Sequence, residues 1–327
     1  MQIFELWSTI KKSIMRHHVV PILTISLIHF TLFPMNNIIH EQGFVPVPGG
    51  QVWFQKSYTK ESEHKAPLLI VHGGPGVSHH YLSNLTALAT ERPIILYDQL
   101  GSGASKPTNP DNSSWVLPRF VEELGAVIAH HKLQGFHLMG HSWGGALVGT
   151  YALQCPQGIK TLTLASPLLS TKRFAEDAKE LLKTLPAEVQ AIIEHHEKAG
   201  TTDSKEYLDA AQVFYDHFLC RTKLPKDPNQ TFNFDVYLTM WGPSEFTVTG
   251  NLLDFDILAK LHELEMPVLI TAGRFDEVRP ETMEYASSRI KKATLAIFEK
   301  SAHRSHEEEQ ELYVQTLKDF LNNHEKS

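Results

Sequence analysis

Short apolar runs recur along the chain from about residue 43 onward, each bounded by turn-forming residues. Residues 51–58 alternate between polar and apolar types, as a half-exposed strand does, whereas residues 67–72 are apolar throughout. Such continuous runs are typical of strands covered on both faces, as in parallel sheets. Similar runs lie at residues 93–98, 136–140, 161–165, 268–272 and 294–298. The pattern therefore predicts a mostly parallel sheet.

Amphipathic helical patterns lie between most of these runs, at residues 119–132, 144–153 and 309–321. Alternating strands and helices predict an α/β fold with helices on both faces of the sheet. The alternation fails between residues 167 and 251, where helical segments follow one another without a buried strand, at residues 174–185, 186–198 and 205–219. We expect this stretch to be a helical cap, inserted into a core of residues 43–166 and 252–327.

The N-terminal segment, residues 1–42, has a different pattern. Lys11, Lys12 and Arg16 precede an apolar run at residues 19–35, which resembles a signal peptide or a short membrane anchor. Pro21 and His29 interrupt the run, and no clear cleavage site follows it. Two interpretations stay open at this point: export or membrane association through residues 19–35, or an apolar extension packed on the domain or a misplaced start.

Composition narrows the function classes. With 42% hydrophobic and 20% charged residues, the chain has the composition of a soluble globular protein. Its formal net charge of −7 and its lack of a dense basic stripe argue against nucleic acid as a partner. The two cysteines, Cys155 and Cys220, have neither zinc-site nor redox spacing, and the adjacent histidine pairs are poorly suited to chelation. We expect no metal and no cofactor.

The strongest local signal surrounds Ser142, in Gly140-His-Ser-Trp-Gly-Gly145. This motif directly follows an apolar strand and directly precedes a helix, which is the context of a nucleophile elbow. The sharp turn needs small residues beside the serine, and Gly140 and Gly144 supply them. The sequence therefore predicts an α/β-hydrolase fold with Ser142 as its nucleophile.

A serine hydroxyl needs a base to take its proton and an acid to orient that base. In this fold the acid and then the histidine follow the serine along the chain. Asp276 comes directly after the run at residues 268–272, and His303 directly after the run at 294–298. His306 is a competing base, but it lies farther from the end of its strand. We therefore expect Asp276 and His303 to complete a catalytic triad.

The oxyanion of the tetrahedral intermediate also needs backbone donors. The segment His72-Gly-Gly-Pro-Gly76 follows an apolar run and is the counterpart of the glycine-rich loop that supplies one N–H group. Pro75 has no N–H to give, so Gly74 is the expected donor from the loop. The residue after the nucleophile, Trp143, is the expected second donor.

Several motifs together resemble the proline iminopeptidase (prolyl aminopeptidase) family of serine peptidases, and especially its branch of tricorn-interacting aminopeptidases. The resemblance covers the chain from about residue 43 to its end. Besides the loops around Gly74 and Ser142, the motifs that carry it are Asp98-Gln-Leu-Gly-Ser-Gly103, Trp241-Gly-Pro-Ser-Glu-Phe246 and Gly273-Arg-Phe-Asp-Glu-Val-Arg-Pro280. The N-terminal apolar segment and residues 304–307 depart from the family's pattern. The family's soluble members lack such a segment, so the resemblance implies a cytoplasmic location as the alternative to export or a membrane anchor.

This resemblance implies a function and a set of site residues. Members of the family release an N-terminal residue, often proline, from short peptides, without a metal. The resemblance implies Ser142, Asp276 and His303 as the triad and Gly74 with Trp143 as the oxyanion hole. It further implies that Glu245 and Glu277 hold the α-amino group of the substrate. The expected partners are short peptides with a free N-terminus.

A general carboxylesterase or lactonase of the same fold is the alternative, because it would use the same triad. It would not need the two glutamates. A scaffold without enzymatic activity is disfavoured, since none of the three triad residues is missing from the sequence.

Overall fold

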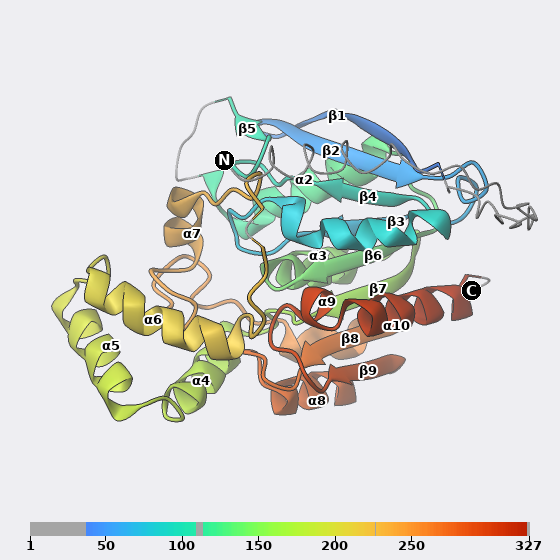
Figure 1. The fold of residues 1–327 in the computed structure, drawn as a ribbon. Coiled ribbons are helices and arrows are strands. Elements are labelled where there is room, and N and C mark those ends of the chain that lie inside the picture. Colours follow the sequence, from blue (N-terminus) through green and yellow to red (C-terminus); the bar gives the residue numbers. More distant parts are fainter. Residues whose placement is uncertain (1–36, 109–113, 226, 326–327) are drawn as a thin grey trace, which may run out of the picture. The chain divides into compact units, whose positions relative to one another are not determined.

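The computed structural model describes residues 37–108, 114–225 and 227–325. Within these residues the strands form a nine-stranded sheet in the order β1-β2-β4-β3-β6-β7-β8-β9, and β5 pairs with β2 (Figure 1). The strands are β1 (Ile39–Val47), β2 (Gly50–Tyr58), β3 (Leu68–Val71), β4 (Ile94–Tyr97), β5 (Lys106–Pro107), β6 (Phe136–His141), β7 (Ile159–Ala165), β8 (Val268–Gly273) and β9 (Ala293–Phe298).

The sheet is parallel from β4 to β9 and antiparallel at its other edge. Strand β3 pairs in parallel with β4 and β6, and β7 pairs in parallel with β6 and β8. Strand β9 adds to β8 in the same direction. Strands β1 and β2 form an antiparallel pair that joins the sheet through β4. The predicted mostly parallel α/β sheet is therefore confirmed.

Helices cover both faces of the sheet. On one face lie α2 (Leu117–His130), α3 (Trp143–Gln154) and α8 (Pro280–Ser288), and on the other η1 (His79–Thr90), α9 (Ser305–Glu308) and α10 (Gln310–Asn323). Alternate residues of β3 divide between the two apolar cores, because successive side chains of a strand point to opposite faces. Leu69 and Val71 join the first core, and Leu68 and Ile70 join the second.

The segment between β7 and β8 consists largely of helices. It contains α4 (Thr171–Leu182), α5 (Ala187–Ala199), α6 (Lys205–Phe218), α7 (Phe234–Met240) and η3 (Leu258–Glu263). Figure 1 shows α4, α5 and α6 to one side of the sheet. They share a separate apolar core, which includes Phe214 and Phe246. We call residues 167–251 the helical insertion; its division from the core as a domain stays a prediction.

Strand β1 is not predicted by the pattern of apolar residues. It begins at Ile39, so it crosses the boundary predicted at residue 43. Most of its side chains are at least partly exposed, because it is an edge strand paired only with β2 in the main ladder. The apolar run at residues 19–35 lies outside the described residues. Within the described part of the chain, none of the helices is long and apolar enough to cross a membrane.

Candidate active site

Ser142 lies at the turn between β6 and α3, in an unusual backbone conformation. Its φ is 58° and its ψ is −122°. A Cβ atom at position 140 would lie 2.1 Å from the carbonyl oxygen of Gly144, and one at position 144 would lie 2.3 Å from the carbonyl oxygen of Val71. Only glycine fits at either position. The Ser142 side chain does not cap α3, so its hydroxyl is not engaged there.

The loops after β8 and β9 bring Asp276 and His303 together. His303 Nδ1 lies 2.8 Å from Asp276 Oδ1, and both side chains are buried. The same carboxylate oxygen accepts the Val278 N–H at 3.0 Å, which fixes its orientation. Because a carboxylate accepts hydrogen bonds, Nδ1 of His303 carries the proton. Nε2 is then the nitrogen with a free lone pair.

Ser142 and His303 line one cavity of about 170 Å³, together with Gly74 and Glu245. The described residues include no hydrogen bond between the Ser142 and His303 side chains. His303 Nε2 instead lies 3.5 Å from Oε1 of Glu277. Catalytic contacts of this kind often tighten only when substrate binds. The structure therefore brings the three predicted triad residues to one site, although the described residues include no hydrogen bond from Ser142 to His303.

His306, the competing base, is held apart from Asp276. Its buried ring packs against the rings of His141 and Tyr81, at centroid distances of 4.9 and 5.5 Å. Burial, together with the positive charge of Arg304, lowers the pKa of His306 to about 3. His306 is therefore neutral at ordinary pH. The geometry favours His303 as the partner of Asp276.

A chain of hydrogen bonds connects the glycine-rich loop to His303. The Gly73 N–H donates to the Tyr81 hydroxyl at 2.7 Å, and that hydroxyl lies 3.0 Å from Nδ1 of His141. Nε2 of His141 lies 3.0 Å from the backbone carbonyl oxygen of His303. Since a carbonyl only accepts, Nε2 carries the proton and Nδ1 accepts from Tyr81. Burial lowers the pKa of His141 well below its usual range, which keeps this arrangement neutral.

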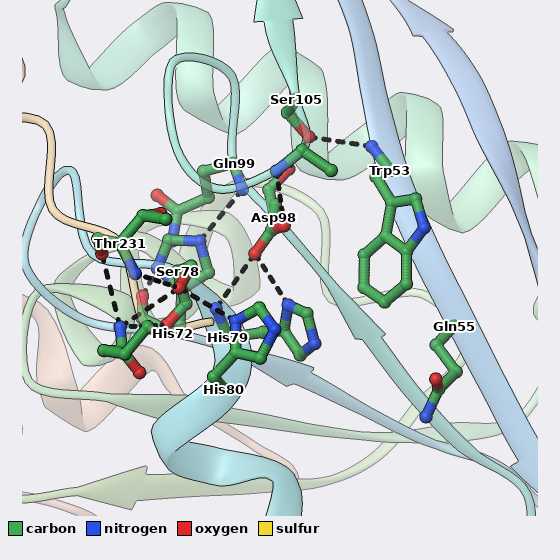
Figure 2. A network of polar contacts seen from close by, with 12 residues as sticks. Trp53, Gln55, His72, Ser78, His79, His80, Asp98, Gln99, Ser105 and Thr231 are labelled. Atoms are coloured by element: carbon green, nitrogen blue, oxygen red, sulfur yellow. Dashed lines mark hydrogen bonds and ion pairs between the residues drawn. The ribbon is translucent and has the colours of Figure 1, made fainter. Parts of the chain in front are cut away.

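Gln99 joins the glycine-rich loop to the residue after the serine. Its Nε2 donates to the His72 carbonyl oxygen at 2.7 Å, and its Oε1 accepts from the Trp143 indole at 2.8 Å. Its backbone N–H donates to Nε2 of His72 at 2.9 Å, a bond drawn in Figure 2. Burial lowers the pKa of His72 to about 4, so its Nε2 stays an acceptor. Gln99 thus fixes both segments that are expected to bind the oxyanion.

Asp98 anchors the neighbouring turn. One of its carboxylate oxygens accepts the backbone N–H of His79 at 2.9 Å and lies 2.8 Å from the Nδ1 atom of that residue, as Figure 2 shows. The other oxygen accepts the Ala104 N–H at 2.9 Å. Burial raises the pKa of Asp98, but the combined lowering effects of His79, His72 and the Ala104 N–H outweigh it, and the net shift of the pKa is downward. Asp98 is therefore an ionised structural anchor beside the glycine-rich loop.

Glu245 and Glu277 place two carboxyl groups beside the predicted triad residues. Glu245 comes from the helical insertion, and Glu277 directly follows Asp276. Burial, the charge of Glu245 and the charge of Asp276 all raise the pKa of Glu277 well above its usual range. Burial also raises the pKa of Glu245, against the opposing effects of His303 and of a hydrogen bond from Tyr237. Neither Glu277 oxygen has a hydrogen-bond partner among the described residues.

The helical insertion also contacts the loops of the acid and the histidine through its backbone. The carbonyl oxygen of Phe218, at the end of α6, accepts the N–H of Glu277 and the N–H of His303, both at 3.2 Å. The sheet and the insertion therefore position these residues together. Over residues 37–108, 114–225 and 227–325, no cluster of three or more His, Cys, Asp or Glu side chains is arranged to hold a metal ion.

Comparison with known proteins shows to which family the chain belongs. The profile of the alpha/beta hydrolase fold matches residues 66–310. A proline iminopeptidase of Heyndrickxia coagulans is 46% identical over 290 residues, which cover 87% of this chain and 99% of that protein. The chain belongs to the proline iminopeptidase family.

Other members of the proline iminopeptidase family agree with this assignment. A proline iminopeptidase of Saccharolobus solfataricus is 34% identical over 86% of this chain and 92% of its own. The crystal structure of a proline iminopeptidase of Mycobacterium smegmatis superposes with a TM-score of 0.78, at 32% identity, over 87% of this chain and 99% of its own. The predicted family, fold and hydrolase class are confirmed, and the esterase or lactonase alternative is not favoured. Peptide partners are supported in general terms, whereas membrane association is not.

Sequence reasoning missed several residues of this proline iminopeptidase site. Tyr81, Gln230 and Leu219 line the cavity with Ser142, yet none of them lies in a motif that signals chemistry. The Tyr81 hydroxyl reaches the loop because η1 packs beside β4, which the sequence pattern did not indicate. Arg304 also lines the cavity, and its position directly after the predicted catalytic histidine was the available signal.

Proposed function

We propose that this chain is a serine aminopeptidase that releases the N-terminal residue, proline or another small apolar residue, from short peptides. The observation that carries the proposal is the proximity of three features: the Asp276–His303 pair, the strained Ser142 and the carboxyl groups of Glu245 and Glu277. The first two features provide acyl transfer chemistry. The third provides a site for a cation.

In the proposed reaction, Ser142 attacks the carbonyl carbon of the N-terminal residue. Nε2 of His303 accepts the proton of the hydroxyl, and Asp276 stabilises the imidazolium that forms. The imidazolium then protonates the leaving nitrogen, and the shortened peptide departs. Water, activated by the same histidine, attacks the acyl-enzyme and releases the amino acid.

The backbone N–H groups of Gly74 and Trp143 are the proposed donors to the oxyanion. Gly74 lines the cavity with Ser142, and Trp143 follows the serine directly. In the part of the chain that the structure describes, neither N–H donates to a protein acceptor. The hydrogen bonds of Gly73 and Gln99 support the proposal, because they hold the two donor segments in place without using the donors themselves.

Glu245 and Glu277 are the proposed ligands of the substrate's terminal ammonium group. A charge-assisted hydrogen bond contributes about 1.5–3 kcal/mol. Burial and the charges of Glu245 and Asp276 raise the pKa of Glu277, so they favour its neutral form over its carboxylate when no cation is present. An ammonium beside it would favour the carboxylate, whereas an acetylated N-terminus would not. Free amines should therefore be strongly preferred.

A narrow extension of the cavity suggests where the side chain of the first residue lies. It is lined by Trp143, Leu168, Phe174 and Trp241, and it shares Ser142 with the main cavity. Its volume is only about 10 Å³, so these side chains must move slightly to admit a ring. An apolar and tight site of this kind supports a preference for small apolar N-terminal residues.

The test compares the wild-type enzyme with Ser142→Ala on prolyl, alanyl and leucyl p-nitroanilides, each with a free and with an N-acetylated amine. We expect hydrolysis of the free-amine substrates only, and its loss in the variant. Equal hydrolysis of acetylated substrates, or turnover of simple esters without any amide hydrolysis, would refute the aminopeptidase function.

A further inference from the structure

Charged side chains of opposite sign line the cavity that contains Ser142. Glu245 supplies a carboxyl group and Arg304 a guanidinium group to the same cavity of about 170 Å³. Binding sites for drug-sized ligands are usually larger, at about 300–1,000 Å³. The cavity therefore suits a very short substrate that carries both a positive and a negative charge.

The guanidinium of Arg304 is held in place by two neighbours. Its Nε forms an ion pair with the carboxylate of Glu307, three residues further along, without the geometry of a hydrogen bond, and its Cζ lies 5.6 Å from the centroid of the Tyr81 ring. Tyr81 is itself fixed by the Gly73 N–H. Arg304 is thus an oriented side chain, 28% exposed, at the wall of the cavity.

The Nη atoms of Arg304 remain able to bind a ligand. Throughout the described residues no hydrogen bond from either Nη atom is found, and neither atom is among the buried unpaired groups. A guanidinium presents its donors in a planar fork that matches the two oxygens of a carboxylate. With Nε facing Glu307, the fork formed by the Nη atoms is the part that can face the cavity.

We propose that Arg304 binds the C-terminal carboxylate of a dipeptide, which makes free dipeptides the preferred substrates. This inference rests on the proposed aminopeptidase function. The amine and the carboxylate of an extended dipeptide lie roughly 6 Å apart, a span that fits within one small cavity. The ammonium binds at Glu245 and Glu277, the scissile carbonyl meets Ser142, and the carboxylate of the second residue meets Arg304.

The direct test measures kcat/KM for prolyl-alanine and for prolyl-alanine amide at pH 7, where the N-terminal amine of each substrate is protonated. The two substrates differ only in the C-terminal charge. We expect the free acid to be preferred by about tenfold, because a partly solvated charge-assisted hydrogen bond contributes about that factor. A ratio near one in the wild-type enzyme would overturn the proposal.

Variants at position 304 locate the effect. In Arg304→Gln the ratio of free acid to amide should fall to about one, and Arg304→Lys should keep part of it, since the charge remains but the fork is lost. Arg274→Gln is the matched control, because Arg274 pairs with Glu299 on the surface and should keep the wild-type ratio. An unchanged ratio in Arg304→Gln would overturn the proposal, even if the overall rate fell.

A third substrate, prolyl-aspartic acid amide, distinguishes the source of the carboxylate. If it were hydrolysed about tenfold faster than prolyl-alanine amide while prolyl-alanine stayed at the level of that amide, Arg304 would recognise an acidic side chain and the dipeptide assignment would be wrong. Failure of the proposed function looks different. In that case none of the free-amine substrates would be hydrolysed, whereas failure of this inference leaves all of them hydrolysed, without a preference for prolyl-alanine over its amide.

Discussion

The sheet and the helical insertion contribute to the site in different ways. Ser142, Asp276 and His303 all lie directly after parallel strands of one sheet, and their positions follow from the strand ends. Glu245 lies in the insertion, whose helices have an apolar core of their own. In our account the sheet carries out acyl transfer, and Glu245 of the insertion, together with Glu277 from the loop after β8, supplies recognition of the amine. A substitution that impairs acyl transfer should slow the hydrolysis of every substrate alike. A substitution that impairs amine recognition should slow only the hydrolysis of substrates with an ammonium group.

Asp276→Asn should have the largest effect, and it should not discriminate between substrates. An asparagine can hold the wrong tautomer of His303, and such a change lowers kcat by about 10⁴. We expect this loss on both prolyl p-nitroanilide and the amine-free ester p-nitrophenyl acetate. Asp254→Asn, at an exposed position, is the control. A loss confined to the anilide would contradict the division of roles.

Glu245→Gln should selectively remove the contribution of the helical insertion to recognition of the substrate's ammonium group. Removing one charged partner of the ammonium should lower kcat/KM for prolyl p-nitroanilide by about 10–100-fold, from a loss of about 1.5–3 kcal/mol. Hydrolysis of p-nitrophenyl acetate should change little. The exposed Glu194 on α5, paired with Lys198, gives the matched control Glu194→Gln. Equal losses on the two substrates would place Glu245 with the catalytic groups instead.

Gln99→Leu tests the link that the Gln99 side chain forms between the His72 carbonyl oxygen and the Trp143 indole. Leucine removes both side-chain hydrogen bonds, so the donors to the oxyanion should become less well ordered. We expect kcat to fall by about tenfold with KM nearly unchanged, because the oxyanion forms only after binding. Gln212→Leu, on the exposed side of α6, should have neither effect. A rise in KM at constant kcat would instead indicate a role in binding.

The buried histidines of the sheet should make the fold sensitive to acid. Burial lowers the pKa of His72 and of His137 to about 4. The unfolded chain binds protons at these sites below about pH 6.5, and the folded chain does not. The contribution of these neutral histidines to the free energy of unfolding should therefore be fully present above pH 6.5. It should be lost as the pH falls toward 4, by roughly 3 kcal/mol at most for His72.

Urea unfolding at pH 7 and pH 5 measures this loss. We expect a lower midpoint at pH 5 in the wild-type protein and a smaller drop in His137→Gln. The control is His64→Gln, because His64 is exposed and the variant should keep the full drop. A midpoint that is the same at both pH values would contradict the burial of neutral histidines in the core.

The two regions also differ in how far the sequence alone predicts them. The buried strands were found within a few residues, because continuous apolar runs bounded by turns have few other structural solutions. Ser142, Asp276 and His303 followed from those strands and from the fixed order of a triad. Glu245 came only from the family resemblance, because a single glutamate in a helical insertion has no local pattern that signals a role.

Long-range contacts account for what could not be predicted. The bond between the Gly73 N–H and Tyr81 depends on η1 lying beside the glycine-rich loop, and η1 is a 3₁₀ helix without a clear amphipathic pattern. The link between Phe218 and the N–H groups of Glu277 and His303 is a backbone contact, so no side-chain type reveals it. Strand β1 escaped the pattern because its exposed edge position permits polar residues.

The most direct test of the central claim is the ratio of kcat/KM for prolyl p-nitroanilide to that for its N-acetylated form, measured in the wild-type enzyme and in the Glu245→Gln and Glu277→Gln variants. Our account predicts a ratio of at least about 10² in the wild type, from two charge-assisted contacts of about 1.5–3 kcal/mol each, and a clear fall in each variant. A wild-type ratio near one, or a high ratio that neither substitution lowers, would contradict the claim that these two carboxyl groups select a free N-terminus.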